Sequence, residues 1–372
     1  MFKRLSYAFC LAAVFFVTMS APAARAREIT VMTRNLYLGA DLAPVITAQT
    51  KEAFEAAAQK ALAQIAASNF PERAVALAKE IAERKPHLVG LQEVYNFTLN
   101  GNNGLPPFRN HLVDLMTALS AQGANYRIAA VVRNIDLRVP LGEDLVGVTD
   151  RDVILARTDV STSVVPVAGT MCNASLDGCN YQVVARVVNL RGSVAMERGF
   201  VAVDVDSLAG NGPVRFVNTH LEARGTGPAN PLFPAIQAAQ ASELITILAG
   251  MPNPLGAKIV IAGDINSSPR DQTRNVGPYT IVPPYRQLTA AGYTDAWTLQ
   301  PGNPPGYTCC QAGNLLNAES IINERIDVTF TSELPAGKVK VNIVGNDKAD
   351  KTSSGLWPSD HAGVVTRMEF AR

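Results

Sequence analysis

Hydrophobic and polar positions follow two different periods along the chain. Apolar residues at helical spacing predict four helices, over residues 51–67, 72–85, 109–123 and 234–250. Short runs of β-branched and apolar residues, bounded by turn residues, predict strands between them. The predicted strands cover residues 28–36, 87–94, 126–132, 151–157, 199–205, 214–221, 259–266, 324–332 and 362–370. Strands that alternate with helices indicate an α/β fold.

Three polar or proline-rich segments interrupt this pattern, at residues 95–110, 134–150 and 265–308. In a compact domain, long loops of this kind indicate either disorder or a functional rim. No repeat period, Gly/Ser linker or run of charge divides the chain after residue 26. We therefore expect one domain, residues 27–372, which is long enough to bury a large α/β core.

The first 26 residues have a pattern of their own. Lys3 and Arg4 precede an apolar run, and "ARA" at residues 24–26 matches a cleavage site. This arrangement predicts a secretory signal peptide, because its apolar part is too short to span a bilayer. Without cleavage the segment would be a membrane anchor. No later apolar run approaches membrane-spanning length, so we expect a secreted or periplasmic monomer with no stable membrane span.

Charge restricts the kind of partner. Cleavage removes Lys3, Arg4 and Arg25 from 33 Lys and Arg and none of the 32 Asp and Glu, which leaves a net charge of about −2. Proteins that grip long polyanions usually carry a basic excess or basic clusters, and the sequence has neither. Any phosphate chemistry should therefore be confined to a local site.

Five cysteines are present, and cleavage would remove Cys10. Cys172 and Cys179 flank a short turn sequence, which predicts a disulfide in an exported protein. Cys309 and Cys310 are adjacent, and three arrangements compete: a vicinal disulfide, bridges to the first pair, or a mixture with a free thiol. A metal site is the weaker interpretation, since no histidine flanks either set.

Polar residues stand where six apolar runs stop. They are Asn35, Glu93, His220, Asp264 with Asn266, Asp327, and Asp360 with His361. Any one of them is typical of a turn residue that caps its own backbone. Six together favour a shared site, whose carboxylate and amide oxygens suit Mg²⁺ or Ca²⁺ better than zinc. A hard cation, a base and polar donors are what metal-assisted attack of water on a phosphate ester requires.

The segments that carry these residues resemble the motifs of the endonuclease/exonuclease/phosphatase superfamily, which has the deoxyribonuclease I-like fold. They are "TRNL", "LVGLQEV", "VNTHLEAR", "IAGDINSSP", "RIDVTF" and "SDHAGVV", in the family's order, and they span residues 29–369. The resemblance implies a four-layer α/β sandwich of two mixed β-sheets packed face to face with outer helices. It implies an active site at one rim of the sheets.

The resemblance also implies a metal site. Glu93 resembles the principal metal ligand of the family, and Asn35 and Asp360 are its expected companions. The expected cofactor is Mg²⁺, with Mn²⁺ or Ca²⁺ as alternatives.

Further roles follow by resemblance. Asp264 orients or deprotonates the attacking water, and Asn266 binds a phosphate oxygen. Because residues i and i+2 of a strand share a face, this pair is expected to point at one phosphate. His361 resembles the catalytic imidazole, held by Asp327. His220 resembles the second histidine, on the side of the leaving group.

Five other residues are considered for the site. Arg198 stands where relatives often place a phosphate-binding basic residue, although an ordinary surface arginine is an equal alternative. Asp150 or Asp152 could support His220, but a turn carboxylate beside an arginine is the simpler interpretation. His87 and His111 receive no role. 

The predicted function is hydrolysis of a phosphodiester, with a nuclease-type substrate first. The alternatives are a phosphatase or phospholipase C-type enzyme acting on phosphorylated lipid or inositol, and a phosphate-binding module without catalysis. Lipid-cleaving relatives usually display an exposed aromatic hairpin, which the sequence does not indicate. Phosphatases of inositol polyphosphates would need several basic residues, for which only Arg270, Arg274 and Arg286 are available. A serine-hydrolase elbow and a P-loop are both missing from the sequence.

Overall fold

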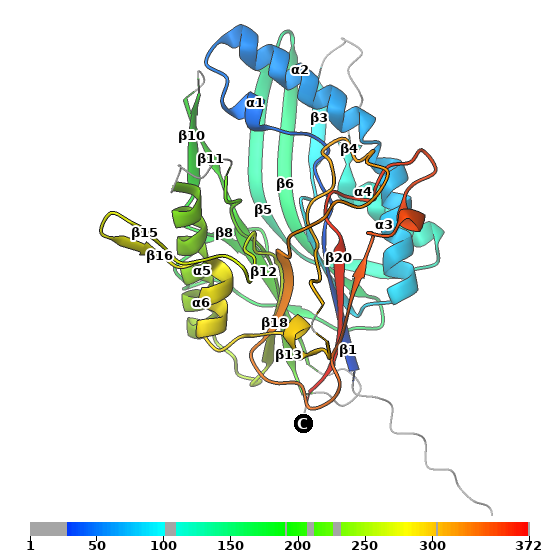
Figure 1. The fold of residues 1–372 in the computed structure, drawn as a ribbon, viewed down its shortest axis with the longest axis vertical. Coiled ribbons are helices and arrows are strands. Elements are labelled where there is room, and N and C mark those ends of the chain that lie inside the picture. The colour runs from blue at the N-terminus through cyan, green and yellow to red at the C-terminus, as the bar shows by residue number, and fades with distance from the viewer. Residues whose placement is uncertain are drawn as a thin grey trace, which may run out of the picture.

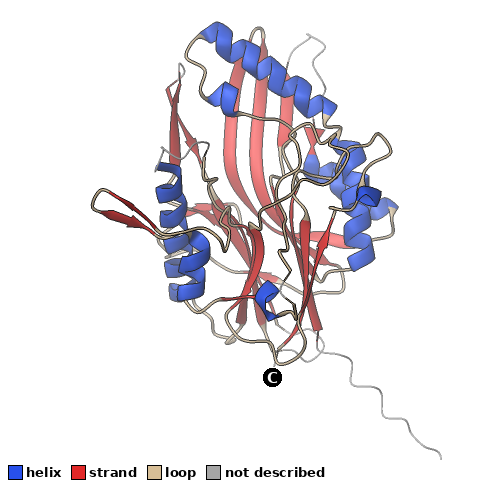
Figure 2. Ribbon diagram, in the orientation of Figure 1, coloured by secondary structure: helices blue, strands red, loops and turns tan. Residues whose placement is uncertain are grey.

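The computed structural model describes residues 28–100, 109–189, 192–206, 212–225, 232–302 and 304–370. The predicted signal peptide, residues 1–26, lies outside these ranges and stays a prediction. The described chain forms two eight-stranded mixed sheets with helices on their outer faces (Figures 1 and 2). This confirms the predicted α/β sandwich.

The first sheet has the strand order β19-β20-β1-β2-β6-β3-β4, and β5 pairs with β6. Its strands are β19 (Lys340–Val344), β20 (Gly363–Glu369), β1 (Glu28–Asn35), β2 (Leu88–Gln92), β6 (Asp144–Arg157), β3 (Asn96–Asn100), β4 (Arg109–Asn110) and β5 (Tyr126–Leu141). β1 and β2 are parallel, whereas β20 is antiparallel to β1.

The second sheet has the order β17-β18-β14-β13-β12-β9-β8, and β7 pairs with β12. Its strands are β17 (Thr294–Asp295), β18 (Asp327–Thr331), β14 (Lys258–Asp264), β13 (Val214–His220), β12 (Gly199–Val205), β9 (Gly178–Asn180), β8 (Asn173–Ser175) and β7 (Ser163–Val164). β13 and β14 are parallel, and β18 is antiparallel to β14.

Two hairpins lie outside these sheets. β10 (Ala185–Asn189) pairs with β11 (Gly192–Met196), and β15 (Arg274–Val276) pairs with β16 (Tyr279–Ile281). The second hairpin projects from the body of the molecule (Figure 1). Tyr279 on it is 73% exposed and is the only aromatic among the large exposed hydrophobic residues of the described chain. No cluster of exposed large aromatic side chains is found among the described residues.

The described chain has six α-helices, of which α3 to α6 cover the outer faces of the two sheets. They are α1 (Ala43–Ile46), α2 (Lys51–Ala67), α3 (Phe70–Arg84), α4 (His111–Ala121), α5 (Leu232–Gly250) and α6 (Pro284–Ala290), with short 3₁₀ turns η1 (Ala296–Leu299) and η2 (Lys348–Asp350). α3 and α4 pack on the first sheet, and α5 and α6 pack on the second. The four predicted helices are α2 to α5, each confirmed to within a few residues. α2 begins after Thr50, whose side chain accepts a hydrogen bond from the Ala53 amide.

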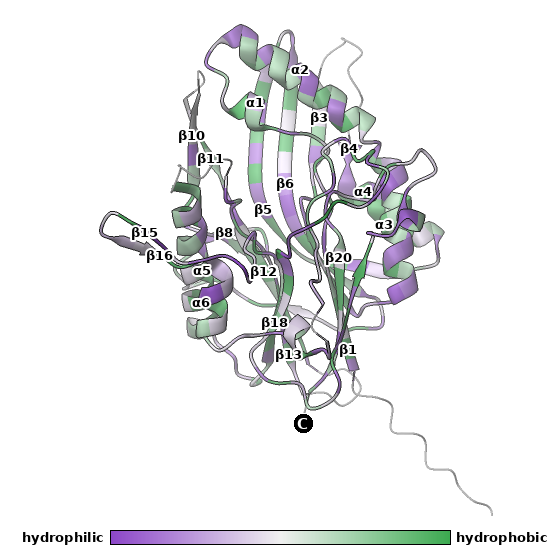
Figure 3. Ribbon diagram, viewed as in Figure 1, coloured by the Kyte–Doolittle hydropathy of each residue, from purple (hydrophilic) through white to green (hydrophobic). Residues whose placement is uncertain are grey.

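α1 and α2 lie across the far ends of β5, β6 and β3, beyond the part of the first sheet that faces the second (Figure 1). Hydrophobic residues alternate with polar ones along these upper parts of β5 and β6 (Figure 3). Residues 134–150, expected to be a loop, are instead most of the long β5–β6 hairpin. The expectation was wrong because it weighed polarity above the alternation of Ile135, Leu137, Val139 and Leu141, which is typical of a strand with one buried face.

The expectation that no later apolar run approaches membrane-spanning length needs correction, whereas the absence of a stable span stays a prediction. α5 has 19 residues and is long and apolar enough to cross a bilayer by length and composition. In the structure, Ala241, Leu244, Ile247 and Leu248 of this helix pack into the core on the second sheet. A core helix passes the same test, so α5 is weak evidence for a span.

Candidate active site

The ends of four strands bring polar side chains to one edge of the sandwich. Asn35, His220 and Asp264 are the last residues of β1, β13 and β14, and Glu93 directly follows β2. β18 and β20 run in the opposite direction, so this edge meets their beginnings, which carry Asp327 and His361. In register, Asp327 pairs with Asp264 and Asp264 pairs with His220.

Strand periodicity explains why these side chains face one another. Phe216 of β13, Val260 and Ala262 of β14, and Val31 of β1 belong to the core between the two sheets. Residues two or four positions further along a strand share that inner face, which directs His220, Asp264 and Asn35 into the same space. The structure thus brings together residues that are more than two hundred positions apart.

Asp264 lies at the centre of this group. Its Oδ2 accepts a hydrogen bond from Asn35 Nδ2 at 3.1 Å and lies 3.5 Å from His220 Nε2 and 3.8 Å from His361 Nδ1. Its Oδ1 accepts from the Asn266 amide at 2.9 Å. Burial, reinforced by the charge of Asp327, raises the pKa of Asp264 to about 7. A carboxylate with this pKa can accept a proton near neutral pH.

His361 is held by Asp327. Its Nδ1 lies 2.8 Å from Asp327 Oδ2, and both side chains are buried. Burial opposes a charged ring, but the carboxylates of Asp327, Asp360 and Asp264 outweigh it and hold the pKa of His361 well above its usual range. With Nδ1 donating to Asp327, Nε2 is left for another partner.

His220 has a different partner. Arg198 Nη1 lies 3.0 Å from His220 Nδ1, and its guanidinium lies within 4 Å of Asp150 and Glu222. Because an arginine can only donate, Nδ1 accepts and Nε2 carries the proton. Burial, together with the charge of Arg198, lowers the pKa of His220 well below its usual value, so the ring is neutral.

Two expectations about this part of the site are corrected. Asp150 and Asp152 are not turn residues, since both are fully buried in β6, where Asn134 donates to their carboxylates. They do not contact His220 directly, because Arg198 stands between Asp150 and the ring. Burial raises the pKa of Asp150 to about 7.

Glu93 and Asp360 supply oxygens on the other side of Asp264. Glu93 Oε2 accepts from the Leu38 amide at 2.8 Å, and its Oε1 accepts from Asn35 Nδ2 at 3.2 Å. Burial raises the pKa of Asp360 to about 6, and the charge of Glu93 adds to this shift. Both carboxylates are partly exposed, and a divalent cation would relieve the repulsion between them, so the donor set fits a hard cation. Asn35 turns its nitrogen toward the carboxylates, and ligation through its oxygen requires the amide to rotate.

The backbone at two site residues is unusual. Glu93 has φ +56° and Asn266 has φ +50°, in the left-handed region that residues other than glycine rarely adopt. Asn266 therefore lies in a turn beyond the end of β14, and the expected i, i+2 strand relation to Asp264 is wrong. It still reaches the site: its Nδ2 donates to the Leu221 carbonyl at 3.0 Å and lies 3.2 Å from His220 Nε2, a contact that is no hydrogen bond when Nε2 carries the proton. Backbone strain of this kind often accompanies functional positions.

The comparisons with known proteins agree with this geometry. A sequence profile of the Endonuclease/Exonuclease/phosphatase family matches residues 64–361. The chain belongs to this family. Members of the family are phosphoester hydrolases, such as nucleases and phosphatases, and they typically use divalent metal ions.

Solved structures show the same fold. The endonuclease/exonuclease/phosphatase from Beutenbergia cavernae superposes with a TM-score of 0.52 at 20% identity, over 93% of this chain and 72% of that chain. The catalytic domain of human nocturnin superposes with a TM-score of 0.50 at 16% identity, over 93% of this chain and 96% of that chain. No curated protein sequence matches the chain significantly.

Two buried arginines, which the sequence did not single out, hold the loops of this family site. Arg34 forms an ion pair with Glu80 at 3.0 Å and donates to the carbonyl of His361. Arg73 donates to the carbonyls of Leu36, Tyr37, Ser68 and Pro358. These residues thereby connect α3 to the segments that carry Asn35 and Asp360. For Arg73, the sequence signal was a charged residue on the apolar face of the predicted helix at residues 72–85.

The two histidines without a predicted role lie outside the catalytic group. His87 Nδ1 accepts from the Thr30 amide at 2.9 Å, and burial lowers the pKa of His87 to about 4. His111 stacks on Phe70, with 3.6 Å between ring centroids, and its Nδ1 lies 3.3 Å from the Glu93 carbonyl. His111 therefore supports the backbone of Glu93, a contact that its place on a helix did not reveal.

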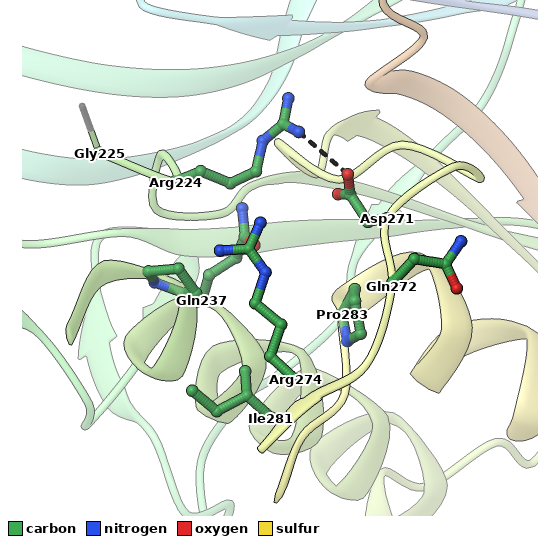
Figure 4. A pocket seen from close by; sticks show the side chains of 9 residues that line it. Arg224, Gly225, Gln237, Asp271, Gln272, Arg274, Ile281 and Pro283 are labelled. Carbon is green, nitrogen blue, oxygen red and sulfur yellow. Dashed lines mark hydrogen bonds and ion pairs between the residues drawn. The ribbon is translucent and has the colours of Figure 1, made fainter. Parts of the chain in front are cut away.

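A polar cavity of about 330 Å³ lies between Arg224, Gln237, Asp271 and Arg274 (Figure 4). Gln237 in its wall donates to the Asn266 carbonyl at 2.7 Å, and Arg274 points toward Gln237 (Figure 4). Of the three arginines considered for inositol phosphates, only Arg274 lines this cavity. Arg270 donates to the Asn323 carbonyl and Arg286 to the Asp271 carbonyl. The guanidinium groups of Arg270 and Arg286 are thus held by backbone carbonyls.

The cysteines pair locally. Cys172 is joined to Cys179, with 5.5 Å between their Cα atoms, as predicted. Cys309 is joined to Cys310, the first of the three arrangements considered. The backbone of Cys309 forms isolated antiparallel β-bridges with Glu324 and with His361. The Cys309–Cys310 pair therefore lies beside the site.

Proposed function

We propose that the protein is an exported, divalent-metal-dependent phosphodiesterase. One observation carries the proposal: Asp264, a buried carboxylate with a pKa of about 7, lies within 4 Å of both His220 and His361. A base poised near neutral pH between two imidazoles suits the activation of water beside a phosphate. Carboxylates suited to a cation adjoin it.

Each group has a role in the proposed reaction. Asp264 Oδ2 takes the proton of the attacking water. His361 Nε2, left available by the contact between Nδ1 and Asp327, holds a phosphate oxygen together with the Asn266 amide. His220 Nε2 donates a hydrogen bond to the leaving oxygen and keeps its proton, because Arg198 occupies Nδ1 and the neutral ring has no second proton to give. The leaving oxygen then takes its proton from water, and Asp264 returns the proton it accepted to solvent. The contact with Nδ1 gives Arg198 a positioning role instead of the direct phosphate contact expected from the sequence.

The proposed reaction uses one site for the cation, on the carboxylate side of Asp264. Glu93 and Asp360, with Asn35 after rotation of its amide, are the proposed ligands of Mg²⁺, with Mn²⁺ or Ca²⁺ as alternatives. When bound, the cation supplies neutralisation of the phosphate charge and lowers the pKa of a bound water.

The substrate is proposed as a phosphodiester, with nucleic acid first among the candidates from the sequence. Charge does not favour tight duplex binding, since the mature chain carries no basic excess. The scattered contacts of Arg270, Arg274 and Arg286 weigh against inositol polyphosphates. A module that only binds phosphate would not need a base beside two imidazoles, so this arrangement favours catalysis.

The proposal is tested with the mature protein and Mg²⁺ against plasmid DNA, RNA, bis-p-nitrophenyl phosphate, sphingomyelin and inositol phosphates. EDTA should abolish hydrolysis. Glu93→Gln should lower the rate by orders of magnitude, because a neutral amide cannot replace the charge that holds a hard cation. Calorimetric titration with Mg²⁺ should show the matching loss of binding.

The matched control is Glu143→Gln, an exposed carboxylate in the β5–β6 turn. This variant should keep the wild-type rate and Mg²⁺ affinity. Hydrolysis that persists in EDTA and in Glu93→Gln would remove metal assistance from the mechanism. A metal-bound protein that degrades nothing in the panel would favour the binding module.

A further inference from the structure

A second cavity, unlike the polar one, lies between α1 and α2 and the far ends of β5, β6 and β3. Its volume is about 300 Å³. Of the residues that line it, only Arg138 is charged, and Tyr95 is the only other one with a polar side chain. Small-molecule sites typically begin at about this volume and have mostly apolar walls. Ala58 and Ala61 of α2 line the cavity where larger side chains would fill it.

Three chain segments run from the candidate active site into the wall of this cavity. Tyr95 lies two residues after Glu93, and Met196 lies two residues before Arg198. On β6, Val146 and Val148 line the cavity, while Asp150 follows on the same face because strand side chains alternate. One face of β6 therefore changes from apolar at the cavity to acidic beside Arg198.

Tyr95 forms the boundary between the two regions. It is buried, its ring stacks on Phe97 with 5.4 Å between centroids, and both rings line the cavity. Tyr95 thus presents an apolar ring to the cavity at a position two residues from Glu93 of the site.

We propose that this apolar cavity binds an alkyl or acyl chain of the substrate, so that the phosphodiester hydrolysed at Asp264 is that of an amphiphile. The inference rests on the proposed function, because it takes the phosphate to lie at the strand ends. It names a substrate class that the catalytic groups alone do not select, and it favours amphiphilic diesters over nucleic acids.

The wall explains the choice of an alkyl chain. A nucleobase or sugar would bring several hydrogen-bonding groups into a wall that offers partners only at Arg138 and Tyr95, and unpaired buried polar groups weaken binding. An alkyl chain has none to satisfy. Each methylene removed from water strengthens binding by about fourfold, so a chain gains affinity with length until the cavity is full.

The test is a series of p-nitrophenyl phosphodiesters whose second ester group is methyl, butyl or octyl, each below its aggregation concentration. We expect kcat/KM to rise at least 100-fold from methyl to octyl, mainly through a lower KM. Equal values along the series would overturn the inference and leave the proposed function standing. Hydrolysis of no member would instead count against the proposed function.

Two variants on one helix sharpen the test. Ala58→Phe places a ring in the cavity and should remove the dependence on chain length while the methyl ester keeps its rate. Ala56→Phe places the same ring on the exposed side of α2 and should leave the dependence unchanged. If Ala58→Phe does not fold, Ala58→Leu replaces it in the test and should reduce the dependence on chain length by a smaller amount. A dependence that survives in a folded Ala58 variant would contradict the cavity as its source.

Discussion

Asp327 Oδ2 lies 2.8 Å from His361 Nδ1, and buried carboxylates hold the pKa of that ring above its usual range. Asp327→Asn keeps the shape of the side chain but removes its charge. We expect the ring to lose its preferred tautomer and its raised pKa. Activity should fall by roughly 100-fold or more, because general acid–base catalysis typically contributes at least that factor to the rate.

The measurement is kcat on bis-p-nitrophenyl phosphate, with circular dichroism to confirm the fold. His361→Ala should be at least as damaging, and the double variant should be little worse than His361→Ala, because both act through one ring. Rates near wild type for either single variant would assign the pair to structure alone.

At the scale of elements, the two sheets are joined beneath the site by one buried amide. Asn218 of β13 donates to the carbonyls of Leu91 and Val153, at 2.9 and 3.1 Å, and accepts from Gln92 Nε2 at 2.6 Å. Gly90 opposite has no room for a side chain, since an added Cβ would lie 2.7 Å from Asn218 Oδ1. The sheets can approach this closely only because that position is glycine.

Asn218→Ala should therefore destabilise the protein by about 3 kcal/mol, at about 1 kcal/mol for each lost hydrogen bond. Urea unfolding followed by fluorescence measures the change. Asn342→Ala, at an exposed position of β19, is the matched control and should change stability by less than about 0.5 kcal/mol. Equal effects of the two variants would mean that Asn218 does not join the sheets.

Each cysteine pair links residues that are close together in the chain. Cys172 and Cys179 close the short β8–β9 hairpin, and Cys309 and Cys310 lie beside His361. Peptide mapping without reduction should recover one disulfide within residues 172–179 and a second disulfide between the adjacent residues 309 and 310. A peptide that crosslinks the two regions would contradict both pairings.

For the whole molecule, export is the main untested expectation. The charged start, apolar run and "ARA" sequence predict that the mature chain begins at Arg27. Mass spectrometry of material exported from a bacterial host should show this terminus directly. Retention of Met1 in the membrane fraction would instead indicate an uncleaved anchor.

Much of the fold could be predicted because periodicity is a local property. The helix at residues 51–67 and the strand at 199–205 are predicted to the residue, since an alanine-rich segment favours a helix and a short continuous apolar run favours a buried strand. The β5–β6 hairpin was missed where polar residues alternate with apolar ones on its exposed face. Short strands such as β10 and β15 were missed because their stability comes from pairing.

The sequence alone specified which residue types stand at the strand ends, and therefore the candidates Glu93, Asp264 and His361. Which of them touch depends on strand register and on the direction in which distant strands run. The contact of Arg198 with His220, the turn that carries Asn266, and the cavity that joins Tyr95 to α2 arise only from the assembled sheets. Side chains far apart in the chain meet only when burial of both sheet faces sets their distance, and no local pattern encodes that distance.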